Sequence, residues 1–105
     1  MKSLEERLKE FEIKLQDYDF ALFFKEIRNK LIGVWASEVL NIEDKNPFIK
    51  KIRKADLKKN EDIELLEILE KEFKEKNYQI TKEELKIKIV ELEQKAKEEL
   101  LEENS

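Results

Sequence analysis

The sequence predicts an all-α protein, a single-domain antiparallel helical bundle of four to five helices with an amphipathic N-terminal helical arm. Gly33 and Pro47 are the only glycine and proline among 105 residues, whereas sheet proteins need such residues at many tight turns. Charged residues make up 46% of the chain, and Glu, Lys, Leu and Ile form a helix-favouring mixture. Apolar residues recur at helical spacing between short polar connections, which favours antiparallel neighbours in a bundle.

The first helix is expected within residues 3–17. Ser3 is a candidate N-cap, and Glu6 follows three residues later, as in a capping box. Apolar residues then recur every three or four positions on an otherwise charged helix: Leu4, Leu8, Phe11, Leu15 and Tyr18. Such a helix can pack on its own bundle or insert into a groove of another protein.

The second helix is expected from Asp19 to Leu40 and is predicted to be central, because its apolar residues are not confined to one face. Its main apolar stripe consists of eight residues: Phe20, Phe23, Phe24, Ile27, Leu31, Val34, Trp35 and Val39. Aromatic side chains near its start could stack on a base, but at this spacing they are more typical of a core. Gly33 lies inside the helix, where glycine costs about 1 kcal/mol relative to alanine. Close packing of a neighbouring helix would explain why glycine stands there.

Three further helices are expected downstream. Asn46 is the predicted N-cap of the third, with Pro47 at its first position. Asn60 is the predicted cap of the fourth. Thr81 and Glu84 have the spacing of a capping box at the start of the last helix.

Charge is unevenly distributed along the middle of the chain. Residues 45–59 carry seven positive charges and one negative, a net of +6, and residues 61–75 carry seven negative and two positive, a net of −5. Two neighbouring helices that attract one another would explain this pattern, and a basic patch for an acidic partner is the alternative. The overall net charge of −4 argues against nucleic acid as a partner.

Several kinds of chemistry are excluded by composition. The chain contains no cysteine and no histidine, so thiolate chemistry, the usual general base and the commonest metal ligand are missing. We therefore expect neither a metal site nor an enzymatic activity. No apolar run approaches the roughly 20 residues that span a bilayer, and the charged N-terminus does not resemble a signal peptide. A cytoplasmic protein without direct membrane insertion is expected.

One segment resembles a known family. Residues 28–38 read RNKLIGVWASE and resemble the RNKLLGLWAAE motif of the alphaproteobacterial ATP synthase zeta subunit. Residues 11–14 read FEIK and residues 54–57 read KADL, and these are similar to the F-E-x-K and K-A-D-F segments of that family. The resemblance extends over residues 4–98. The motif residues that mark it are Arg28, Asn29, Lys30, Gly33 and Trp35.

The resemblance implies an inhibitor subunit of the F-type ATP synthase. Residues 1–17 would form the inhibitory helical segment, which inserts into a catalytic interface of the enzyme's head, and residues 18–105 would form the bundle. The predicted anchors in the partner's groove are Leu4, Leu8, Phe11 and Leu15, and the predicted charged contacts at its rim are Glu5, Arg7, Glu12 and Lys14.

The expected partners are the catalytic-head subunits. The chain is expected to be a monomer that is peripheral to the inner membrane because it binds the synthase. Binding of adenine nucleotide, reported for some family members, also follows only from the resemblance. A small nucleotide-binding helical regulatory protein is the alternative function.

Overall fold

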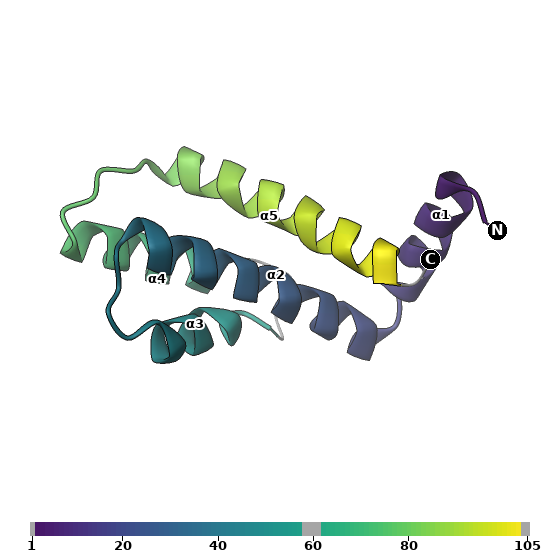
Figure 1. The fold of residues 1–105 in the computed structure, drawn as a ribbon, viewed down its shortest axis with the longest axis horizontal. Coiled ribbons are helices and arrows are strands. Elements are labelled where there is room, and N and C mark those ends of the chain that lie inside the picture. Colours follow the sequence, from purple (N-terminus) through teal and green to yellow (C-terminus); the bar gives the residue numbers. More distant parts are fainter. Residues whose placement is uncertain (1, 58–61, 104–105) are drawn as a thin grey trace.

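The computed structural model describes residues 2–57 and 62–103 and folds them into five α-helices without a β-strand. The helices are α1 (Leu4–Lys14), α2 (Tyr18–Val39), α3 (Lys45–Arg53), α4 (Ile63–Glu75) and α5 (Lys82–Glu103). The two longest, α2 and α5, have 22 residues each and run antiparallel along the molecule (Figure 1). α1 lies near the end at which both termini are found (Figure 1). The predicted all-α class is confirmed.

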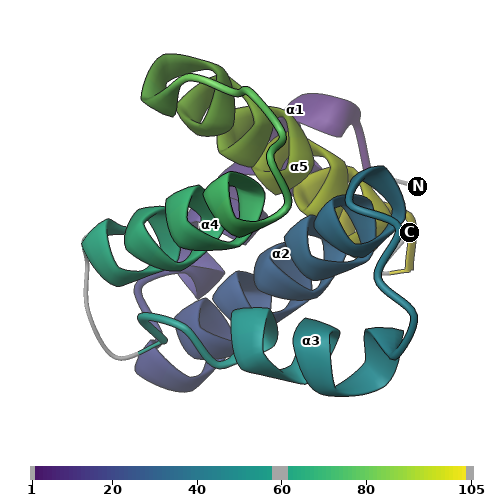
Figure 2. The same ribbon diagram turned by 90° about the vertical axis from the view of Figure 1, so that its left-hand side faces the viewer.

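Most of the apolar interior lies between α2, α3, α4 and α5. α2 packs against α3 on one side and against α5 on another, and α4 packs against α5 (Figure 2). We call the buried residues shared by these four helices and the turns that follow α2 and α3 the main core: Ile32, Ala36, Leu40, Phe48, Ile52, Ala55, Leu65, Leu66, Leu69, Phe73, Leu85 and Ile89. A second, smaller group of buried residues, the terminal core, consists of Phe11, Phe24, Ala96 and Leu100. The terminal core joins α1 to the antiparallel pair α2 and α5.

The buried face of α2 differs from the predicted stripe. Ile32 and Ala36 have no exposed surface, whereas Phe23 is 51% exposed. The reason is that α2 is covered by neighbours on more than one side, so a single apolar stripe does not define its buried surface. The expectation at Gly33 is correct: a Cβ placed there would lie 3.1 Å from the backbone Cα of Ile49 in α3.

Local capping explains where three of the helices begin. The Ser3 hydroxyl oxygen accepts a hydrogen bond from the Glu6 backbone N–H, at 3.2 Å. The Asp17 carboxylate caps α2 in the same way, which starts α2 at Tyr18, one residue earlier than predicted. Thr81 and Glu84 form the predicted reciprocal capping box at α5.

The third and fourth helices begin differently from the prediction. α3 begins at Lys45 with Asp44 as its N-cap residue, so the prediction of Asn46 as N-cap is wrong. Pro47 lies in the first turn, where its missing N–H leaves no intrahelical bond unmade. Asn60, the predicted cap of the fourth helix, lies outside the described residues, and α4 begins at Ile63.

Ion pairs join the basic and acidic segments to their neighbours. Lys51 of α3 pairs with Glu72 of α4, in agreement with mutual attraction of these helices. Arg53 of α3 pairs instead with Glu26 of α2. Because all four side chains retain contact with solvent, these pairs orient the helices more than they stabilise them.

Candidate functional site

The N-terminal helix is joined to the bundle by a short turn. The backbone N–H groups of Gln16 and Asp17 donate to the carbonyl oxygens of Ile13 and Lys14, at 3.1 and 2.9 Å. Asp17 is already the N-cap of α2, so residues 15–17 form the whole connection between the two helices. α1 is therefore a separate helical element, and none of its residues belongs to the main core.

Phe11 holds α1 against the bundle. It is 3% exposed, and its ring packs edge to face against Phe20 and Phe24 of α2, with centroids 5.5 and 5.3 Å apart. Ala96 and Leu100 of α5 complete the terminal core around it. Such aromatic pairs contribute beyond the area that they bury. Phe11 is the only residue of α1 that is buried.

The other predicted anchors occupy different environments. Leu15 is half-buried against the terminal core, and Leu8 is also half-buried. Leu4, at the start of the helix, is 58% exposed. Ile13, which the apolar stripe does not include, is 65% exposed. The structure thus divides the predicted groove-binding stripe into a part that faces the bundle and a free N-terminal part.

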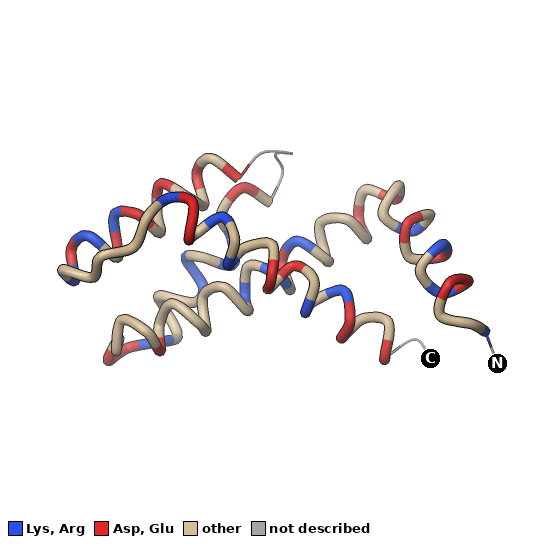
Figure 3. The backbone as a smooth tube through the Cα atoms, turned by 90° about the horizontal axis from the view of Figure 1, so that it is seen from above, with Lys and Arg blue, Asp and Glu red and all other residues tan. Residues whose placement is uncertain are grey.

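Three of the four predicted rim charges lie on the outer surface of α1. Charged residues of both signs follow one another along this helix at the N-terminal end of the molecule (Figure 3). Glu5, Glu12 and Lys14 are exposed, and Arg7 is half-buried. Within the described residues, the buried Nε of Arg7 has no hydrogen-bond partner. Glu5, Glu12 and Lys14 are therefore placed where a partner surface could reach them, whereas Arg7 is partly covered.

The motif residues lie elsewhere and form a buried polar network. Arg28 of α2 is 5% exposed and donates to both carboxylate oxygens of Asp62, at 2.8 and 3.2 Å. It also donates to the side-chain oxygen of Asn29, at 2.9 Å, and lies 3.5 Å from the carboxylate of Glu93 in α5. A guanidinium with this planar, two-pronged pairing is well suited to a buried site. Arg28 therefore ties α2 to the start of α4 and to α5.

Asn29 and Asp56 extend the network to α3 and α4. Asn29 has no exposed surface, and its amide donates to the backbone carbonyl of Ala55, at 2.8 Å. The carboxylate of Asp56, the next residue along the chain, accepts from the backbone N–H of Leu65 in α4, at 2.9 Å. The two family-like segments, residues 28–38 and 54–57, thus meet in space.

The rest of the motif also contributes to the fold, with one exception. Gly33 permits the close approach of α3, and the indole ring of Trp35 stacks on Phe73 of α4, with centroids 5.5 Å apart. Lys88 of α5 lies over the indole, 5.5 Å from its centroid. Lys30 alone is exposed. The motif residues therefore mainly hold the helices of the bundle together. Their partners Asp56, Asp62 and Glu93 were not predicted from the sequence, although Asp56 lies in the family-like KADL segment.

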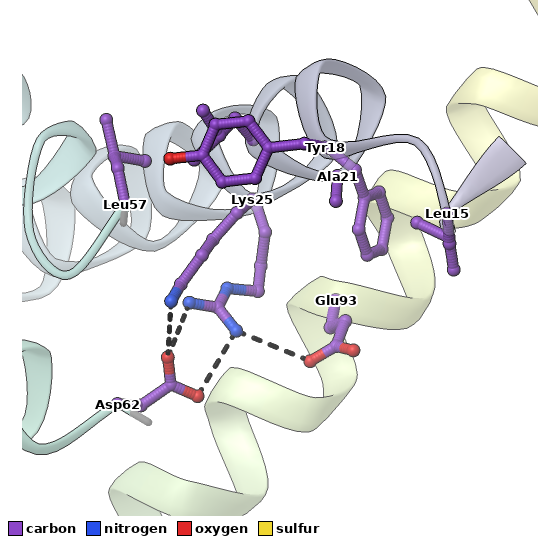
Figure 4. A pocket seen from close by; sticks show the side chains of 10 residues that line it. Leu15, Tyr18, Ala21, Lys25, Leu57, Asp62 and Glu93 are labelled. Atoms are coloured by element: carbon purple, nitrogen blue, oxygen red, sulfur yellow. Dashed lines mark hydrogen bonds and ion pairs between the residues drawn. The ribbon is translucent and has the colours of Figure 1, made fainter. Parts of the chain in front are cut away.

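A pocket with a volume of about 360 Å³ lies beside the turn between α1 and α2. Leu15 and Tyr18 line one part of it, and the Lys25 ammonium, 3.8 Å from an Asp62 carboxylate oxygen, lines another (Figure 4). Burial lowers the pKa of Lys25, and the neighbouring Arg28 charge acts in the same direction, while Asp62 opposes both. The cations of the pocket already face carboxylates. An anionic ligand would have to compete with these pairs.

Neither a metal centre nor a membrane span is found in the described part of the chain. Within residues 2–57 and 62–103, no three carboxylates come together as ligands for an ion. None of the helices described there is long and apolar enough to cross a bilayer.

Comparison with known proteins identifies the family. The family model described as ATPase inhibitor subunit zeta matches residues 1–99. No curated protein matches the chain, and no solved structure matches it. The family match includes α1, the three-residue turn, the polar network and most of α5. The chain therefore belongs to the ATPase inhibitor subunit zeta family, whose role is regulatory.

Proposed function

We propose that this chain inhibits the F-type ATP synthase by inserting α1 into a catalytic interface of the enzyme's head, where it blocks ATP hydrolysis. Residues 1–17 are the inhibitory segment, and the bundle of residues 18–105 carries it. The partners are the catalytic-head subunits. The monomeric chain lies on the cytoplasmic side and is peripheral to the inner membrane through the synthase.

The separateness of α1 is the observation that carries this proposal. The helix has 11 residues and one buried side chain, Phe11, and a three-residue turn connects it to α2. No residue of α1 belongs to the main core. α1 can therefore leave the bundle without opening the interior that holds α2 to α5 together.

Binding energy would come mainly from the part of the stripe that is exposed in the free chain. Burial of an exposed leucine stabilises a complex by about 1.5–3 kcal/mol, so Leu4 gains most from entering a groove. Phe11 and Leu15 would exchange one apolar environment for another. Ordering and immobilisation costs of association oppose these gains, which makes each exposed anchor important.

Leu4 gives the sharpest test because it can be changed without disturbing the bundle. Leu4→Ala should leave the melting temperature almost unchanged, as expected for an exposed side chain. It should raise the concentration needed for half-inhibition of ATP hydrolysis by the matching enzyme by about tenfold, which corresponds to about 1.4 kcal/mol. Ile87→Ala is the matched control, because Ile87 is a similarly exposed aliphatic residue on α5, and it should inhibit normally.

Removal of the whole segment tests the same assignment. A chain that begins at Tyr18 retains every residue of the main core and should keep its helical circular dichroism. It should lose inhibition of ATP hydrolysis. If the shortened chain inhibits as well as the full one, the inhibitory surface belongs to the bundle and the assignment of residues 1–17 is wrong.

The pocket beside the first turn favours a second candidate, a nucleotide-binding regulatory protein. Tyr18 could stack on an adenine ring while Lys25 and Arg28 face its phosphates. Because Asp62 and Glu93 already neutralise these cations, we rank this function second. Saturable binding of ADP that Lys25→Met weakens, without recovery of head subunits in a pull-down, would reverse the order.

A further inference from the structure

We propose that the bundle holds α1 in an autoinhibited position, and that release of Phe11 from the terminal core controls how strongly the chain inhibits. This inference rests on the proposed function of α1 as the inhibitory segment. It adds a competition between two sites for the Phe11 side chain. One is the socket formed by Phe20, Phe24, Ala96 and Leu100 of this chain, and the other is the groove of the partner.

The same face of α1 is required for both positions. Phe11 lies in contact with Phe20 and Phe24 and is 3% exposed. Leu8 and Leu15, three or four positions away on the same stripe, are half-buried. A helix with one apolar stripe cannot present it to the bundle and to a partner at the same time. In the docked position Phe11 is therefore unavailable to a partner, and Leu8 and Leu15 are only partly available.

The socket is built so that it can open without loss of the fold. Its residues from α5, Ala96 and Leu100, belong to the terminal core and not to the main core. The Ser3 hydroxyl caps α1 from within its own segment, so the first turn of the helix does not depend on the bundle for that hydrogen bond. Cations lie over Phe11 and over one ring of the socket: Lys97 of α5 is 5.6 Å from the Phe11 centroid, and Lys14 of α1 is 5.9 Å from the Phe20 centroid.

The consequence is quantitative. If only the released fraction of the chain can bind, the apparent dissociation constant is the intrinsic one divided by that fraction. A change on the bundle side of the socket should then strengthen inhibition, because it favours release and leaves α1 itself intact. A helix that inhibits from its docked position predicts no such gain of function.

The first test uses two leucines of α5 in the full chain. Leu100→Ala enlarges the socket and should lower the concentration for half-inhibition of ATP hydrolysis several-fold, while it accelerates amide exchange in residues 4–14. Leu92→Ala is the matched control, because Leu92 lies on the same helix but packs against the main core. It should change neither the inhibitory concentration nor the exchange of residues 4–14. Thermal melts establish that both variants are folded. Unchanged or weaker inhibition by a folded Leu100→Ala would overturn the proposal.

The second test fixes α1 in place. Glu10 and Leu101 line the same small hollow, of about 20 Å³, beside Phe11, and the natural chain has no cysteine. The double variant Glu10→Cys, Leu101→Cys is joined with a short bifunctional thiol reagent, and the control is the same protein capped with a monofunctional one. The joined form should inhibit at least tenfold less well. Full inhibition by the joined form would contradict autoinhibition, and so would a failure of the two thiols to join.

These outcomes separate the two proposals. If Leu4→Ala and the chain that begins at Tyr18 both inhibit fully, the proposed function of α1 fails. If Leu4→Ala loses inhibition, while Leu100→Ala gains none and the joined form inhibits fully, α1 inhibits from its docked position. Only the autoinhibitory contact is then wrong.

Discussion

The carboxylate of Asp56 caps α4 from outside the helix, through a hydrogen bond of 2.9 Å that it accepts from the backbone N–H of Leu65. Leu65 is in the first turn of α4, where N–H groups have no intrahelical acceptor. Asp62 is the N-cap residue, but its side chain makes no capping bond because it pairs with Arg28. Asp56 also has a φ of 53°, a left-handed conformation that aspartate tolerates better than most residues. One residue thus shapes the chain after α3 and starts α4.

Asp56→Ala should therefore be strongly destabilising. Loss of a helix cap costs about 1–2 kcal/mol, and alanine is strained at this φ, so the free energy of unfolding should fall by about 2–3 kcal/mol in urea titrations. Asp56→Asn is the control, because asparagine retains an acceptor oxygen and tolerates the same backbone. It should lose less than half as much. Equal losses for the two variants would show that the negative charge, rather than the cap, matters.

Two adjacent motif residues should differ sharply in their effect on stability. Asn29→Ala leaves the buried carbonyl of Ala55 without its donor and the guanidinium of Arg28 without one of its acceptors, at a cost of about 1–3 kcal/mol. Lys30→Ala changes an exposed side chain and should alter the free energy of unfolding by less than about 0.5 kcal/mol. Chemical denaturation measures both. If Lys30→Ala is as harmful as Asn29→Ala, the network described for this motif does not hold the bundle together.

Trp35→Ala should lower the free energy of unfolding by about 3 kcal/mol, the low end of the range for large aromatic residues, because Trp35 is only partly buried. The loss comes from its stack on Phe73 and its contact with Lys88. A melting curve is the measurement. Val90→Ala, at an exposed position on α5, is the control and should melt like the natural chain, and a Trp35→Ala variant that does the same would assign the indole to binding instead.

The helix starts that could be predicted best from the sequence are those determined by a capping side chain close by in the chain. Ser3, Asp17 and Thr81 each accept from an N–H three residues later, and such a signal is contained in a few adjacent residues. The cap of α4 was missed because it comes from Asp56, which only the tertiary fold brings to Leu65. The start of α3 was missed because proline is allowed at any position of a first turn.

The candidate site was predictable in one respect and not in another. The stripe on α1 follows from its spacing, and the family resemblance supplied a role for it. Which anchors are free depends on packing: Phe11 meets α5 through Leu100, whereas Leu4 is left exposed. Nothing in the local sequence contains that information, because it depends on how α1 lies against a helix that starts almost 80 residues later.

Lys25 should make stability depend on pH in the alkaline range. Its pKa in the folded chain is lowered from 10.5 by burial, so the folded state disfavours the charged form. Below the folded pKa this group therefore opposes folding, and the opposition is relieved as the pH rises from the folded pKa towards 10.5. Lys25→Met should be at least as stable as the natural chain at pH 7, because Asp62 retains Arg28.

That advantage of Lys25→Met should shrink as the pH approaches 10.5, which urea titrations at the two pH values would measure. Lys30→Met, at an exposed position of the same helix, is the control and should show no such trend. A Lys25→Met variant that is clearly less stable than the natural chain at pH 7 would mean that the Asp62 pair outweighs burial.

The free chain should open first at α1. An 11-residue helix is too short to be stable alone, and its attachment depends chiefly on Phe11, whereas residues 24–36 span the middle of α2. Amide protons of residues 4–14 should therefore exchange faster than those of residues 24–36, through an opening that leaves the main core intact. Phe11→Ala should remove the remaining protection of residues 4–14 without changing that of residues 24–36, and Leu4→Ala should change neither. If both segments exchange at the same rate, and Phe11→Ala accelerates both equally, α1 opens only with global unfolding. In that case the helix could not leave the bundle to reach a partner.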